Sequence, residues 1–120
     1  MEPQIDATEF GAITVASQKI ENDIIIGLDG QVRKRKKKLS KSIYGTSHML
    51  SLDEAKYIYE KGADWLIIGT GQYDSVRLSP EAQAYLEQKR CAVTLLPTPQ
   101  AILAWNKAQG NGIALFHITC

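Results

Sequence analysis

Residues 65–81 read WLIIGTGQYDSVRLSPE, and this stretch decides the fold class. Its first part, WLII, is apolar without alternation, which is typical of a central strand covered on both faces of a sheet. At its end, Ser79 and Pro80 predict a helix, because serine is a favoured N-cap and proline needs no amide in the first turn. A buried strand that leads into a helix indicates an α/β architecture.

The residues after Pro80 continue this alternation of helices and strands. EAQAYLEQKR (81–90) continues the helix. Three further elements are then expected: a buried strand CAVTLL (91–96), a helix QAILAWNKAQ (100–109) capped by Thr98 and ended by Gly110, and a final strand IALFHIT (113–119). The second half of the chain is therefore predicted to build a largely parallel sheet with helices on both of its faces.

The first half begins with strands. ITVA (13–16) and DIIIGL (23–28) are expected to be strands in an N-terminal β-meander. Asp29-Gly30 predicts a hairpin turn before QVRKRKK, because glycine tolerates the positive φ of a tight turn. SLDE (51–54) matches a capping box, in which the Ser51 hydroxyl and the Glu54 carboxylate satisfy the first free amides of a helix. That helix is expected to run to Lys61 and to stop at Gly62, with an apolar face formed by Leu52, Ala55, Ile58 and Tyr59.

Length and composition bound the class of protein. A chain of 120 residues with 44% hydrophobic residues suits a single domain, residues 1–120, with its own core. Cys91 and Cys120 are too few for a disulfide framework, so we expect reduced thiols. The start MEPQIDATEF has no apolar run, and no stretch of 18 apolar residues occurs. We therefore expect a soluble, cytoplasmic protein without membrane contact.

The net charge of +1 conceals a segregation of charge. RKRKKKLSK (33–41) holds seven of the 14 basic residues, which leaves 7 basic against 13 acidic residues elsewhere, a charge of −6. Such a run can bind an acidic partner, or it can be an exposed edge strand whose lysines prevent aggregation. Nucleic acid is not the expected partner, because the rest of the chain offers no second basic face. The candidate basic surface comprises Arg33, Lys34, Arg35, Lys36, Lys37 and Lys38.

Gly69, Thr70 and Gly71 stand at the carboxyl end of the predicted central strand, where open α/β sheets usually bind ligands. GTGQYD has neither the GK-Ser/Thr ending of a Walker loop nor the GxGxxG fingerprint of dinucleotide sites. Seven residues separate Gly71 from the cap at Ser79, so the helix amides do not follow the glycines to grip a phosphate. A nucleotide site is therefore not expected. A small-ligand pocket and a plain tight turn both remain open.

A second polar cluster, IYGTSH (43–48), lies between the basic run and the helix that begins after Ser51. Glycine-containing polar loops often carry function. Ser47 and His48 do not make a triad, because adjacent side chains diverge. His117 and Cys120 could join His48 as zinc ligands, but their spacing matches no zinc motif. We expect no metal and no cofactor.

Several short stretches together carry a resemblance to a known family. They are Asp29-Gly30, the basic stretch leading to LSKSIYGTSH, LIIGTGQ, LPTPQAI, Trp105-Asn106 and the ending LFHITC. The sequence resembles a small α/β family, catalogued largely as a domain of unknown function, that includes the adipogenesis-associated protein of animals and, more distantly, a mitochondrial complex I assembly factor. The resemblance implies a three-layer fold around a mixed sheet of about five strands, the last antiparallel to the others. It implies no reaction and no catalytic residues.

Two functions are consistent with these features. The first is a noncatalytic interaction or assembly module that meets an acidic protein through the basic segment. The alternative is a pocket for a small anionic metabolite, with or without catalysis, at the carboxyl ends of the central strands. The candidate pocket residues are Lys41, Tyr44, Thr46, Ser47, His48, Gly69, Thr70, Gly71, Gln72, Thr98, His117 and Cys120. If this pocket exists, Gly71→Val should abolish binding and leave the fold mostly intact. The oligomeric state is left open.

Overall fold

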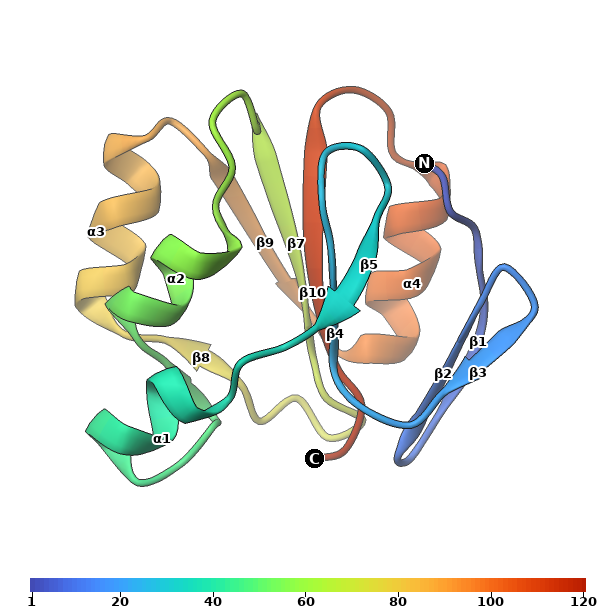
Figure 1. Cartoon of the computed structure of the whole chain (residues 1–120), viewed down its shortest axis with the longest axis horizontal. Helices are drawn as coiled ribbons and strands as arrows, with labels where there is room; N and C mark the ends of the chain where they lie inside the picture. The colour runs from blue at the N-terminus through green and yellow to red at the C-terminus, as the bar shows by residue number, and fades with distance from the viewer.

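The structure, a computed structural model, describes residues 1–120 and centres on a five-stranded mixed sheet (Figure 1). The strand order is β5 (Val32–Lys34), β4 (Ile24–Ile26), β10 (Gly112–His117), β7 (Trp65–Thr70) and β9 (Ala92–Leu96). β10 and β9 both run parallel to β7, whereas β4 is antiparallel to its neighbours β10 and β5. The reversed strand is therefore β4. The expectation that the last strand is reversed is wrong, because a helix crossover connects β9 to β10 and returns the chain in the parallel direction.

β7 and β10 form the buried centre of the sheet, as the unbroken apolar runs predicted. Every residue of β10 is buried, and so is every residue of β7 except Trp65. β9 differs, since three of its five residues are exposed. The prediction that CAVTLL is a buried strand is therefore wrong: β9 pairs only with β7 and forms an edge of the sheet.

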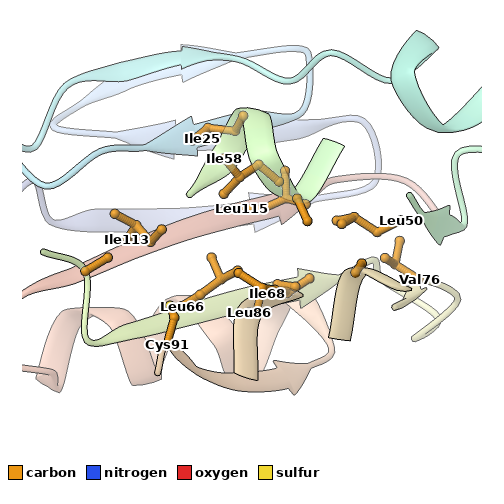
Figure 2. Close-up of a cluster of buried hydrophobic side chains, with 13 residues drawn as sticks. Ile25, Leu50, Ile58, Leu66, Ile68, Val76, Leu86, Cys91, Ile113 and Leu115 are labelled. Carbon is orange, nitrogen blue, oxygen red and sulfur yellow. The ribbon is translucent and has the colours of Figure 1, made fainter. Parts of the chain in front are cut away.

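Helices α2 (Leu52–Ile58) and α3 (Pro80–Gln88) cover one face of this sheet (Figure 1). Figure 2 shows their apolar side chains meeting those of the strands, with Ile58 and Leu86 packed near Leu66, Ile68 and Leu115. The short helix α1 (Lys38–Tyr44) lies beside α2. α1 was not expected, because its sequence KLSKSIY is dominated by the basic run and a glycine follows it.

The opposite face is covered by α4 (Thr98–Lys107) and by a small antiparallel sheet (Figure 1). That sheet contains β1 (Ile5–Glu9), β2 (Ala12–Val15) and β3 (Gln18–Ile20). An N-terminal meander that includes ITVA is therefore confirmed, but DIIIGL does not belong to it, because its strand β4 pairs with β10 and β5 in the main sheet. The buried Trp105 of α4 packs edge-on against Phe116 of β10. The Asp29-Gly30 hairpin is also confirmed, but it joins β4 to β5 within the main sheet.

The helix starts agree only partly with their predictions. Ser51 and Ser79 accept bonds from the amides of Glu54 and Ala82, so both serine caps are confirmed. The capping box is incomplete, because the Ser51 amide donates to Ser40 Oγ while the Glu54 carboxylate faces Arg35. α2 also ends at Ile58 rather than at Lys61.

Thr98 does not cap α4. It is the first residue of the helix, and no side chain provides a capping bond there. Its hydroxyl instead accepts the Gly71 amide and donates to the His117 carbonyl, which ties α4 to the ends of two strands. A short parallel pair, β6 (Met49–Leu50) with β8 (Arg77–Leu78), completes the fold. No helix in the chain has both the length and the apolar character needed to span a bilayer.

Candidate functional site

A cluster of ionisable side chains lies inside the protein at one end of the main sheet. Asp23 precedes β4, Arg35 follows β5, Glu54 lies in α2 and His117 ends β10, and all four are buried. Buried charges are costly unless they are paired, so their contacts account for their presence. Each side chain comes from a different element, and the fold alone brings them together.

Arg35 is the hub of this cluster. Its Nε donates to Glu54 Oε2 at 2.6 Å, and its Nη2 donates to Glu54 Oε1 at 3.1 Å, a bidentate pair. Nη1 donates to Asp23 Oδ2 at 3.0 Å, and Nη2 also donates to the Ser47 carbonyl at 2.7 Å. The Ser40 hydroxyl donates to Glu54 Oε1. One cation thus faces two buried carboxylates.

Asp23 and His117 form a second set of contacts. Asp23 Oδ2 lies 2.7 Å from His117 Nδ1 and 3.5 Å from Lys37 Nζ, and Oδ1 accepts the Ile118 amide at 2.9 Å. Because the carboxylate can only accept, Nδ1 carries a proton and donates it to Asp23. In the neutral ring, Nε2 is then an acceptor, and it lies 3.2 Å from Thr119 Oγ1. The structure therefore contains a hydrogen-bonded series from Asp23 through His117 to the hydroxyl of Thr119.

Neighbouring groups shift the pKa values of Asp23 and Arg35 in this cluster, and that of the adjacent His48. Burial would raise the pKa of Asp23, but the hydrogen bond and charge of His117, the Ile118 amide and Lys37 lower it to about 2. Burial likewise opposes the charge of Arg35, yet Glu54 and Asp23 outweigh it and raise the pKa of Arg35. Burial and the neighbouring His117 lower the pKa of His48, whose ring packs edge-on against His117 with 5.4 Å between centroids. Asp23 is thus a carboxylate, and Arg35 is charged, at neutral pH.

A cleft of about 570 Å³ opens directly above Asp23. Two of the segments that line it are the one that leads from β5 into α1 and the one that follows β10. Both strands end there at their carboxyl ends, the edge of an α/β sheet where ligands usually bind. Its lining residues are Gly11, Glu21, Asn22, Asp23, Lys34, Arg35, Lys36, Lys37, Lys38, Ile118 and Thr119. Four lysines and one arginine thus share the cleft with two acids.

The candidate basic surface takes up one wall of this cleft. Lys34, Lys36, Lys37 and Lys38 line it, and β5 is an edge strand, as one reading of the basic run expected. The prediction is wrong for Arg35, because this residue is 3% exposed and its guanidinium pairs with Asp23 and Glu54 inside the cluster. Arg33 does not line the cleft. Its guanidinium lies 4.3 Å from the centroid of the Tyr57 ring.

The candidate residues of the GTGQ stretch are buried in the sheet or hydrogen-bonded to other parts of the protein. Gly71 donates its amide to Thr98 Oγ1, and the amide of Gln72 donates to the Thr119 carbonyl. The Thr70 hydroxyl donates to Asp74 Oδ1, and Gly69 and Thr70 are buried in β7. None of these residues lines the cleft.

A Cβ at Gly71 would lie 2.2 Å from the carbonyl carbon of Cys120 and 2.8 Å from the His117 ring, and the φ of Gly71 is +103°. Glycine is therefore needed there for the close approach of the chain's own last residues. The structure contradicts the expectation that Gly71→Val spares the fold.

The remaining pocket candidates are spread over several environments. Tyr44 ends α1 and donates to Glu81, Lys41 is exposed on α1, and the Thr46 hydroxyl accepts the amide of His48. Ser47 and His48 contact the cluster from outside it. The Ser47 carbonyl accepts a hydrogen bond from Arg35, and the His48 ring packs against the His117 ring. The Cys120 carbonyl accepts the Tyr73 amide. None of the twelve candidates lines a cavity, and only His117 belongs to the cluster beneath the cleft.

Sequence reasoning missed Asp23, Glu54, Ser40 and Thr119. An acid directly before three isoleucines, as at Asp23, signals a buried carboxylate that needs a partner. Glu54 was assigned to a helix cap, which is the usual role of that residue type at that position. No group of three or more His, Cys, Asp and Glu side chains is arranged to hold a metal ion.

Comparison with known proteins places this architecture in a family. A family model described as "Protein of unknown function (DUF498/DUF598)" matches residues 5–116. The chain belongs to this family. The resemblance to a domain of unknown function is therefore confirmed.

Solved structures agree with membership of the DUF498/DUF598 family. The conserved hypothetical protein PH1505 from Pyrococcus horikoshii OT3 is 30% identical, with a TM-score of 0.90 over 98% of this chain and 99% of that one. A protein named MT938 is 28% identical, with a TM-score of 0.83 over 98% of both chains. An Mth938-like domain from Bordetella pertussis is 15% identical, with a TM-score of 0.61 over 97% of this chain and 85% of that one. The last likeness shows the fold alone.

Proposed function

We propose that this protein binds a small anionic ligand in the lysine-lined cleft. The observation that carries the proposal is the convergence of four lysines from one short segment on a cleft of about 570 Å³. A concave site with several charges of one sign concentrates ions of the opposite sign. The small anionic ligand was the alternative expected from the sequence, and its proposed site moves from the GTGQ loop to the ends of β5 and β10.

The lysines, rather than Arg35, would provide the charge that a ligand meets. The guanidinium of Arg35 is already matched by Glu54 and Asp23. Lys37 lies 3.5 Å from Asp23 Oδ2 and keeps 36% of its side chain exposed, so it stands at the boundary between the cluster and the cleft. Lys34, Lys36 and Lys38 have no carboxylate partner within ion-pair distance. Their charge is available to carboxylate or phosphate groups.

Calorimetric titration with succinate and with pyrophosphate tests the proposal. The test variant is Lys36→Gln/Lys38→Gln, and the matched control is Lys89→Gln/Lys41→Gln. Lys36 and Lys89 both lie over tyrosine rings, and Lys38 and Lys41 are both exposed on α1, but only the test pair lines the cleft. Both variants lose two positive charges, so the net charge of the protein changes by the same amount in each.

The test variant should bind about tenfold more weakly, since each exposed charge pair contributes roughly 0.2–1 kcal/mol. The control should bind as the wild type does. Equal weakening in the two variants would refute a site in the cleft, because it would mean that the anion responds only to net charge.

An acidic protein segment is the second candidate ligand, favoured by one exposed pair of aromatic rings. Phe10 and Tyr73 are 60% and 75% exposed, and their centroids lie 6.1 Å apart. Phe10 precedes Gly11 of the cleft, and Tyr73 bonds to the carbonyl of Cys120, next to Thr119. Aromatic residues are enriched at protein interfaces. A polyglutamate peptide, titrated like succinate, should bind more tightly than succinate if a protein segment is the ligand, and no more tightly if it is not.

A further inference from the structure

Thr119 lines the cleft, and its hydroxyl contacts the buried His117 of the cluster. Thr119 is one of the lining residues, whereas His117 beneath it is buried. The distances are 2.7 Å from Asp23 Oδ2 to His117 Nδ1 and 3.2 Å from His117 Nε2 to Thr119 Oγ1. A carboxylate that orients an imidazole, which in turn accepts from a hydroxyl, is the arrangement by which unrelated folds activate a nucleophile for acyl transfer.

We propose that Thr119 is the nucleophile of an acyl-transfer site, and that its substrate is a carboxylic ester whose acyl part carries a second negative charge. The proposal rests on the anion-binding cleft proposed above, because the lysines would hold that second charge. His117 and Thr119 are the catalytic residues, since they meet the reacting atoms. Asp23 is a positioning residue that acts through His117.

The geometry assigns each step. Thr119 Oγ1 attacks the ester carbonyl carbon and forms a new C–O bond, while His117 Nε2 takes the hydroxyl proton. The tetrahedral intermediate then expels the alcohol of the ester, which takes up the proton from His117. The product is an acylated Thr119. Water attacks this second ester with the same base, releases the carboxylic acid and restores the hydroxyl, so no oxidant, reductant or further reactant is needed.

The environment of each group supports its role. Asp23 is an anion at neutral pH and accepts the Nδ1 proton of His117, so Nε2 is the acceptor in the neutral ring. The charged groups around His117 are Asp23 before β4, Arg35 after β5, with Nη1 at 3.4 Å from Nδ1, and Lys37 through Asp23. His48 presents its ring edge from the other side. Arg35 Nη1 is closer to Asp23 Oδ2, at 3.0 Å, and donates there instead of to the imidazole.

The experiment uses mono-4-nitrophenyl succinate, an ester with an anionic acyl group and a coloured leaving group. The protein carries Cys120→Ser, because a thiol next to Thr119 would compete for the ester. The Cys120→Ser protein, with Thr119 intact, should release one equivalent of nitrophenolate in a burst and gain one succinyl group. Peptide mass spectrometry should place that group on Thr119. Thr119→Val should lose the burst by about 100-fold or more, the usual contribution of such catalysis.

Three further variants separate chemistry from folding. Thr119→Ser keeps a hydroxyl and should keep the burst, and Thr94→Val, at an exposed threonine of β9, should label as the background protein does. Asp23→Asn should abolish the burst at neutral pH and change its pH profile, because the amide would donate to Nδ1 and leave the proton on Nε2. Thermal unfolding of each variant is recorded beside the burst.

The inference is overturned if the succinyl group lies on a lysine, or if Thr119→Val reacts as fast as the background protein. Succinate binding without any burst would overturn the acyl-transfer site and leave the anion cleft standing. If neither succinate binding nor a burst is seen, the proposed function fails as well. An acylated Thr119 that serine restores and valine removes would establish both.

Discussion

Replacing Arg35 with methionine should destabilise the protein by about 3–5 kcal/mol, although the change removes a charged residue from an apolar interior. Methionine fills much of the same space, but it leaves Asp23 and Glu54 as two buried carboxylates without the cation that pairs with both. Removing one partner of a buried ion pair typically costs roughly 3–5 kcal/mol, because the remaining charge is left uncompensated. Since whole domains unfold at about 5–15 kcal/mol, much of the stability would be lost.

Urea unfolding followed by tryptophan fluorescence measures this loss, because the buried Trp105 reports on the core. Arg33→Met is the matched control. Arg33 is two residues away on the same edge, but it only bonds to the Tyr57 carbonyl and stacks on the Tyr57 ring. Its loss should cost about 0.5–1 kcal/mol, the range of an exposed cation–π contact.

The pH dependence identifies the cause. In Arg35→Met, protonation of the two buried carboxylates removes their cost, so the folded variant takes up protons more readily than the unfolded chain does. Its stability is then retained at acid pH and lost as the pH rises. The deficit relative to wild type should therefore shrink from pH 7 to pH 5. A deficit equal to that of Arg33→Met, or one that is unchanged at pH 5, would refute the uncompensated carboxylates as the reason.

Two other outcomes follow from the structure. The pKa of Asp23 is lowered from 3.8 to about 2, so its contribution of about 2–3 kcal/mol is present above pH 4 and is lost as the pH falls through 2. Urea midpoints at pH 4.5 and 2 should therefore diverge less in Asp23→Asn than in wild type, and an equal divergence would contradict this role. Gly71→Ala should cost more than Gly11→Ala, because both residues have positive φ but only a Cβ at Gly71 meets other atoms within 4 Å. The positive φ alone costs roughly 1–2 kcal/mol, and equal losses in thermal unfolding would show that the contact with Cys120 relaxes freely.

Local patterns predicted much of the fold because their physical causes are local. The apolar runs at residues 65–68 and 113–116 predicted β7 and β10, since only a strand covered on both faces has no polar side. The serine caps and the Asp29-Gly30 turn depend on backbone groups within a few residues, and they were found where predicted. The prediction that β9 is buried was wrong for the opposite reason. Whether an apolar strand lies at the centre or at an edge depends on its neighbours, which its own residues do not specify.

The sequence by itself determined the family, the α/β class, the central strands and the basic segment that supplies the cleft with lysines. Only the tertiary structure decided which of those basic residues is buried, because Arg35 meets Glu54 across 19 residues and Asp23 meets His117 across 94. It also decided that Thr98, predicted to cap a helix, and Gly71, predicted to line a ligand loop, contact the end of β10 and the residues after it. Charges separated by that length of chain interact only after the sheet has formed, and no local pattern records which of them will meet.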